Sequence, residues 1–150
     1  MTRPSPAAAA VTGLDGLPVL HSLGDVVRLQ RAVGPVYLRY SLGPCADASE
    51  ESRDEQSGAL LPGLSARPAH PEPWWDRPAE EWVARQLCQY AEAAARGDDR
   101  HGWILTGTES GRGADCEPLL AETTGLAVLH PACLAEARAL CARSFASDRV

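Results

Sequence analysis

The sequence predicts an α+β protein in which a small antiparallel or mixed sheet of four or five short strands packs against about three helices. Three observations predict this class. Apolar residues recur at helical spacing in three segments, 22–33, 78–96 and 131–145. Several shorter segments carry the β-branched, aromatic and apolar residues typical of strands. The later strands follow one another closely along the chain, which favours antiparallel pairing.

The chain is expected to form one domain with two irregular regions. Residues 1–13 resemble a flexible tail, and the remaining residues, 14–150, are enough for a single hydrophobic core. Residues 45–57 contain five acidic residues against one Arg and no large apolar side chain, so we expect a mobile acidic loop. The apolar run 59–66 is broken by Pro-Gly, which predicts two short strands or a strand and a turn.

The first helix and the first strand have clear boundaries. Ser22 can cap helix 22–33 through its hydroxyl, and Gly34 stops it. The next segment, 36–41, alternates with a period of two and predicts a strand. One face of that strand is expected to carry Val36, Leu38 and Tyr40, and the other Tyr37, Arg39 and Ser41.

The most distinctive segment is 72–90, which contains three of the four tryptophans. It begins as an aromatic, proline-rich stretch and continues into the predicted helix 78–96. We expect Asp76 to cap this helix and Pro78 to lie in its first turn. The segment is therefore expected to be a packing centre of the domain.

The last part of the chain predicts three strands and a helix. Residues 108–115 are rich in Gly and polar residues and are expected to form a loop. A C-terminal helix, 131–145, is expected to start at His130 and Pro131. The predicted strands are 102–107, 117–122 and 126–129.

Charge and hydropathy exclude two classes of partner. The net charge is −6, and no basic stripe is interleaved with aromatic residues, so nucleic acid is not an expected partner. No apolar run approaches the roughly 20 residues of a membrane span, and no signal-peptide core is present, so we expect a cytoplasmic protein. The absence of Lys and the abundance of Ala, Arg and Gly suggest a genome of high GC content.

The five cysteines predict neither a disulfide framework nor a metal site. Their number is odd and no C-x-x-C occurs, so reduced thiols are expected. The close pair His130 and Cys133 does not supply the four ligands of a structural metal. Cys88 and Cys141 fall on predicted burial faces and are expected to be inert core thiols, whereas Cys45 and Cys116 fall in polar loops and are more reactive.

Six phrases spread along the chain form a distinctive pattern. They are Tyr37-Leu38-Arg39-Tyr40-Ser41-x-Gly43-Pro44, Leu61-Pro62-Gly63-Leu64-Ser65, Glu72-Pro73-Trp74-Trp75-x-Arg77-Pro78, Trp82-x-Ala84-Arg85-Gln86-Leu87-Cys88-Gln89-Tyr90, Trp103-x-Leu105-Thr106-Gly107 and Gly111-Arg112-Gly113-x-Asp115-x-Glu117-Pro118-Leu119. Together they resemble a family of small actinobacterial proteins classed as a domain of unknown function. The resemblance covers roughly residues 36–145 and implies no activity, cofactor or partner.

The favoured hypothesis is a binding domain for a small polar ligand or a protein partner, without an assignable reaction. Its polar site would gather Arg39, Ser41, Ser65 and Arg112. An Arg in the middle of a strand, between two Tyr, is unusual for a plain solvent-exposed face. The alternative for Arg39 is an ion pair with an acid of the loop 45–57.

A second hypothesis is an NAD-dependent transferase. The order Arg39, Ser65, Glu117 is similar to the Arg–Ser–Glu arrangement of ADP-ribosyltransferases. That resemblance implies that the Arg holds the NAD phosphates, the Ser orders the site and the Glu stabilises the oxocarbenium-like centre. Asp115 and Pro118 depart from the family pattern. The alternative for Glu117 is a solvated strand end.

A third hypothesis is a protein-interaction module using Trp74, Trp75 and Arg77, because Trp and Arg are typical interface anchors. The alternative is that the tryptophans only pack the domain. The Gly-rich segment 106–113 could also cradle an anion through its backbone N–H groups and Arg112, although a hairpin loop is the simpler interpretation.

Overall fold

The computed structural model describes residues 16–43, 64–91, 100–113 and 116–145. The predicted tail and the predicted acidic loop lie outside these residues. The elements in chain order are β1 (Val19–Leu20), α2 (Leu23–Val33), β2 (Tyr37–Ser41), β3 (Leu64–Ser65), β4 (Arg67–Pro68), α4 (Ala79–Cys88), β5 (His101–Arg112), β6 (Pro118–Leu129) and α6 (Pro131–Phe145). The predicted α+β class is confirmed: three helices and a mixed sheet make up the described part of the chain.

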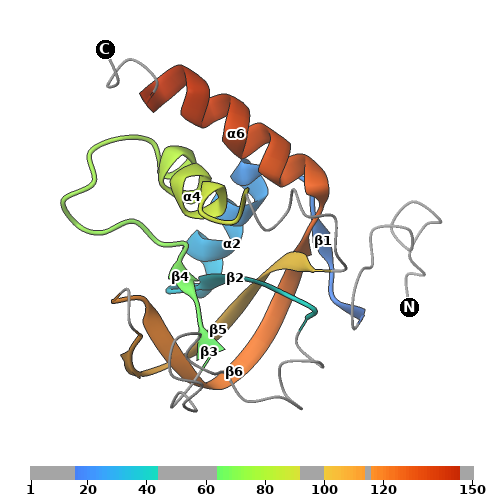
Figure 1. Ribbon diagram of the computed structural model, residues 1–150, viewed down its shortest axis with the longest axis vertical. Helices are drawn as coiled ribbons and strands as arrows, with labels where there is room; N and C mark the ends of the chain where they lie inside the picture. The colour runs from blue at the N-terminus through green and yellow to red at the C-terminus, as the bar shows by residue number, and fades with distance from the viewer. Residues whose placement is uncertain (1–15, 44–63, 92–99, 114–115, 146–150) are drawn as a thin grey trace.

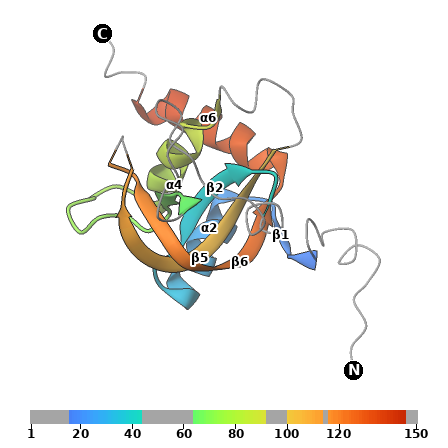
Figure 2. The same ribbon diagram turned by 60° about the horizontal axis from the view of Figure 1, so that its bottom comes forward.

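The sheet curls into a half-barrel (Figures 1 and 2). Its strands follow the order β1-β6-β5-β2-β4, with β1 parallel to β6 and antiparallel pairing between β6 and β5, β5 and β2, and β2 and β4. The short segment 64–68 connects two strands that are not adjacent in the sheet, since β3 pairs with β6 and β4 pairs with β2. This segment therefore draws the two sides of the curled sheet together.

The three helices cover one face of the sheet (Figure 1). Alternation along β2 divides the core into two parts, because successive side chains of a strand point to opposite faces. The helix-side core includes Val36 and Leu38 of the β2 region, together with Val26, Val83 and Ile104. The core within the curl consists of Tyr37, Ala66, Trp103, Leu105, Leu120 and Val128. The two faces predicted for the strand are confirmed.

The predicted loop 108–115 and the predicted break at 123–125 are both wrong within the described residues. β5 continues through Thr108 to Arg112, and a single strand β6 replaces the two strands 117–122 and 126–129. The pairing shifts register between Ile104 and Leu105, between Thr106 and Thr108, and between Glu109 and Gly111. Such bulges bend a strand and increase its twist, so two long strands can wrap around the inner core. The glycines and threonines of these segments therefore lie at bends within the strands and do not form turns between strands.

Helix α2 follows its prediction, whereas α4 departs from it at both ends. Ser22 Oγ accepts a hydrogen bond from the Asp25 N–H at 3.1 Å, as expected of a cap. In α4 the residue before the helix is Pro78, which makes no side-chain cap, so the expected cap by Asp76 is wrong. The helix ends at Cys88, and the last part of the predicted helix, 92–96, lies outside the described residues. Just beyond this end, the Tyr90 hydroxyl donates to the Leu38 carbonyl oxygen at 3.2 Å and fastens the chain to β2.

Candidate functional site

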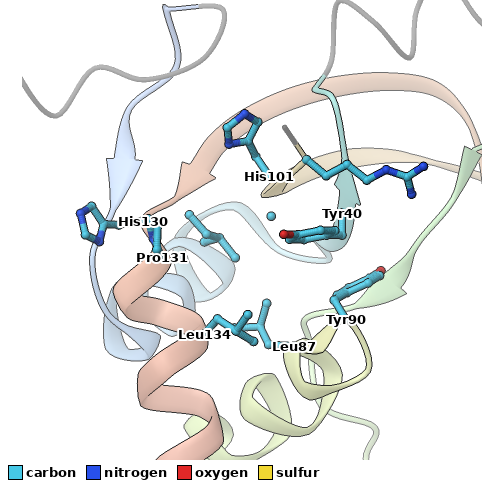
Figure 3. Close-up of a pocket in the computed structure, with 10 residues that line it drawn as sticks. Tyr40, Leu87, Tyr90, His101, His130, Pro131 and Leu134 are labelled. Carbon is cyan, nitrogen blue, oxygen red and sulfur yellow. The ribbon is translucent and has the colours of Figure 1, made fainter. Parts of the chain in front are cut away.

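A cavity of about 350 Å³ lies where the ends of five elements meet. These are the C-terminal ends of β2, α4 and β6 and the N-terminal ends of β5 and α6. Figure 3 shows the side chains that surround it. The lining residues are Tyr40, Leu87, Tyr90, Arg100, His101, Gly102, Leu129, His130, Pro131 and Leu134. The volume is at the small end of the roughly 300–1,000 Å³ typical of ligand sites.

Two stacked tyrosines form one wall of this cavity. Tyr40 projects from β2 toward the helices, and its ring stacks on that of Tyr90 with centroids 5.6 Å apart and planes 20° apart. The pKa of Tyr90 is raised to about 12, chiefly by burial; Arg67 and Arg39 oppose this rise and Glu117 adds to it. At neutral pH the Tyr90 hydroxyl therefore stays protonated and acts as a hydrogen-bond donor to Leu38. This wall therefore offers aromatic ring faces to a ligand, and the Tyr90 hydroxyl does not act as a general base.

Apart from the two tyrosine hydroxyls, the polar side chains at the cavity all carry nitrogen. Arg100, His101 and His130 line it, and no Asp or Glu is among the lining residues, although the whole chain has a net charge of −6. The His130 ring is held in place: its Nδ1 accepts a hydrogen bond from the Ala132 N–H at 3.0 Å in the first turn of α6. It also contacts the ring of His21, with centroids 4.7 Å apart.

The remaining lining is apolar and includes the start of α6. Leu87, Leu129 and Leu134 contribute side chains from three different elements, and Pro131 begins the helix. The N-terminal end of a helix carries a partial positive charge, which adds to the positive charge of Arg100 nearby. The arrangement can enclose an apolar or aromatic body and stabilise a negative group next to it.

The structure brings together two of the four residues expected to bind a polar ligand. Arg39 Nη1 donates to the Ser65 carbonyl oxygen at 2.6 Å and lies 3.4 Å from Ser65 Oγ. Ser41 is buried, and its Oγ accepts hydrogen bonds from Trp103 Nε1 at 2.9 Å and from a backbone N–H at 3.2 Å. Arg112, near the end of β5, forms an ion pair with Glu109 at 3.0 Å. None of the four lines the cavity.

Glu117 lies in the same region as Arg39. The charges of Glu117, Arg39 and Arg67 all affect the pKa of Tyr90. Glu117 also fills the space beside Gly113, where a Cβ would collide with its carboxylate. The cavity is lined by none of Arg39, Ser65 and Glu117.

The tryptophans form an edge-to-face cluster that is only partly buried. Trp82 is 7% exposed and its Nε1 donates to the Pro68 carbonyl oxygen at 2.9 Å. Trp74 is 70% exposed, with its ring centroid 5.8 Å from that of Trp82. Trp75 lies between these extremes. Arg77 pairs with Glu81 at 2.8 Å and donates to the Ser144 carbonyl oxygen at 3.2 Å.

Sequence reasoning missed the cavity. Its principal side chains, Tyr40, Tyr90, His101 and His130, are separated by ten or more residues along the chain and share no motif. The only signal was the predicted position of Tyr40 on the same face as Val36 and Leu38. Within the described ranges, no three His, Cys, Asp or Glu side chains are grouped so that they could hold a metal ion.

The fold and the cavity define a small α+β protein with a curled, helix-covered sheet and a potential ligand site at the edge between the two layers. Residues 13–149 match the family of unknown function DUF6098, and the chain belongs to this family. The expected membership of a family of unknown function is thereby confirmed. No curated protein and no solved structure matches the chain. None of the helices in the described residues combines the length and apolar character needed to cross a membrane.

Proposed function

We propose that this protein binds a small amphipathic anion, with an apolar or aromatic body and a carboxylate-like group, in the cavity beside Tyr40 and Tyr90. The observation that supports this function is the composition of the lining. Tyrosine and leucine side chains enclose the space, and every charged or ionisable side chain there except the two tyrosines is Arg or His. The function agrees with the binding domain expected from the sequence and moves its site from Arg39 to the helix side of β2.

A matched pair of probes tests the proposal. Indole-3-acetate and indole-3-acetamide have nearly the same size, but only the first carries a negative charge. A ligand present at 100 times its Kd adds about 2.7 kcal/mol of stability, which corresponds to a rise in Tm of about 5–10 °C for a chain of this length. We expect the acid to bind at least about tenfold more tightly than the amide, since hydrogen bonds to charged groups contribute about 1.5–3 kcal/mol. Equal binding of acid and amide, or no binding of either, would contradict the proposal.

Variants of the lining residues test whether the two probes bind in the cavity. Replacing both Arg100 and His101 by Gln should abolish the preference for the acid and leave the affinity for the amide unchanged. Arg31→Gln is the matched control, because Arg31 is an exposed cation of α2 that does not line the cavity. Leu134→Phe should weaken both probes by filling the cavity, whereas Leu140→Phe on the same helix should not. An acid that binds the double variant as tightly as the original chain would place its site elsewhere.

A second candidate function is protein interaction through the exposed tryptophan. Trp74 is 70% exposed although it belongs to an aromatic cluster, and Trp is typical of binding anchors. Exposed aromatic clusters suit extended proline-rich peptides, whose preformed helix loses little entropy on binding. Titration with a proline-rich peptide should shift the indole N–H resonance of Trp74 in the original chain, and Trp74→Ala should lose the binding. Shifts confined to other residues would exclude this surface.

The NAD-dependent transferase with Arg39, Ser65 and Glu117 has less support. The Arg39 guanidinium holds the Ser65 main chain, and none of the three residues lines the cavity. Thermal stabilisation by NAD that is lost in Glu117→Gln would favour this function over the first two.

A further inference from the structure

Two cysteines from different helices lie side by side. Cys88, the last residue of α4, and Cys141 of α6 have their sulfur atoms 3.3 Å apart, although 53 positions separate them in the sequence. A disulfide requires about 2.05 Å between the sulfurs, so an approach of about 1.2 Å would form the bond. The two helices pack against each other (Figure 1), and both cysteines pack against the helix-side core.

The surroundings distinguish this pair from the other thiols of the described residues. Both members are partly exposed, so a small molecule can reach the site from solvent. Cys133 is fully buried, and its thiol donates to the Leu20 carbonyl oxygen at 3.3 Å. Cys116 is exposed and follows β5, on a different part of the chain from the helix pair. Sequence reasoning treated Cys88 and Cys141 as inert core thiols, and the structure brings them within reach of each other.

We propose that Cys88 and Cys141 are a dithiol–disulfide site, oxidised by a small-molecule disulfide, whose bond fastens α4 to α6. One protein thiol, after losing its proton, attacks the disulfide R–S–S–R, forms a mixed disulfide and releases one R–SH. The second protein thiol then displaces the remaining R–SH. The protein loses two hydrogen atoms and the small molecule gains them, so the reaction balances as dithiol plus R–S–S–R giving the protein disulfide plus two R–SH.

The surroundings of Cys141 keep its thiol protonated, so the reduced pair reacts slowly at neutral pH. Burial and the neighbouring Cys88 thiol together raise the pKa of Cys141 to about 12, although Arg85 partly opposes them. Cys141 is therefore protonated at neutral pH, and only the thiolate is a nucleophile. The reduced pair is the stable resting state in a reducing environment, and the bond forms when small-molecule disulfides accumulate.

Oxidation of the full chain tests the proposal directly. The protein is incubated with oxidised glutathione, the remaining thiols are alkylated, and the intact mass and the proteolytic peptides are measured. We expect a chain lighter by two hydrogen atoms, with the peptide of Cys88 joined to that of Cys141. We also expect Tm to rise by at least about 5 °C, because a cross-link across a long loop restricts the unfolded chain.

Two sets of variants complete the test. Cys88→Ser and Cys141→Ser should each lose both the cross-link and the rise in Tm. The control, Cys45→Ser with Cys116→Ser, should retain both effects. Full alkylation of Cys88 and Cys141 after the treatment, or stable glutathione adducts on both, would overturn the proposal. The peptide map of the original chain decides the matter even if a variant fails to fold.

Discussion

Replacing Trp82 and Trp74 separately by Ala should have very different effects on stability, although the two indoles touch. Trp82 is 7% exposed and Trp74 is 70% exposed. Removal of a buried Trp side chain costs about 3–5 kcal/mol, and we expect this range for Trp82→Ala. The buried share of Trp74 is about a third of that of Trp82, so the same reasoning gives about 1–1.5 kcal/mol for Trp74→Ala. Trp82→Ala also leaves the Pro68 carbonyl oxygen without its indole donor.

Urea denaturation followed by far-UV circular dichroism measures both free energies of unfolding. For a chain of this length the two variants should lower Tm by about 10–15 °C and about 3–5 °C, respectively. The slope of the unfolding free energy against urea concentration should be the same for both variants as for the original chain, because all three expose the same surface when they unfold. A loss for Trp74→Ala as large as that for Trp82→Ala would refute the reasoning. It would mean that Trp74 supports the core, and the interaction hypothesis would lose its anchor.

Three further predictions concern caps, buried polar groups and pH. Ser22→Ala should cost about 1 kcal/mol in thermal or urea unfolding, because the Asp25 N–H loses its acceptor, whereas Ser22→Asp should retain most of the stability. Ser41→Ala should cost about 1–3 kcal/mol because the Trp103 indole N–H becomes a buried donor without this acceptor; a loss below 0.5 kcal/mol would mean that water replaces the hydroxyl. Burial raises the pKa of Cys133 from 9.0 to about 11, and the negative charges of Glu136 and Asp25 contribute to this rise. The unfolded chain therefore loses this proton at lower pH than the folded chain, and stability should fall by about 2–3 kcal/mol between pH 9 and 11; Cys133→Ala should flatten this part of the curve.

The fold class could be predicted because the relevant patterns are local. Alternation in 36–41 identified a strand and both of its faces, and Ser22 identified the start of a helix. The long strands β5 and β6 could not be predicted with their correct lengths. Gly107 and Gly111 resemble turn residues in the sequence, and only the partner strand shows that they lie at bulges. At Gly107 a Cβ would come within 3.1 Å of the opposite strand, so close packing explains this glycine better than a turn does.

The candidate site was harder to predict from the sequence, because it depends on which helices and strands end near one another. Arg39 and Ser65 were expected to act together, and their contact is present, yet its partner atom is the Ser65 carbonyl oxygen, which every residue has. No property of the Ser side chain in the sequence indicates such a contact. The pairing of Cys88 with Cys141 likewise requires the packing of α4 on α6, which the helical pattern of either segment does not contain.

The two faces of β2 explain why a ligand site would lie on the helix side of the sheet. On the inner side of the curl, Arg39 and Ser41 use their polar atoms to hold the main chain and an indole. On the opposite side, Tyr40 lies near the end of the strand, where α4 is ending and α6 is beginning. Gly102 of β5 has no side chain there, and an added Cβ would lie 3.2 Å from a methyl group of Leu129. The space therefore lies at an edge where α4 has ended and α6 is only beginning, so neither helix extends across it, and the stacked rings of Tyr40 and Tyr90 form one of its walls.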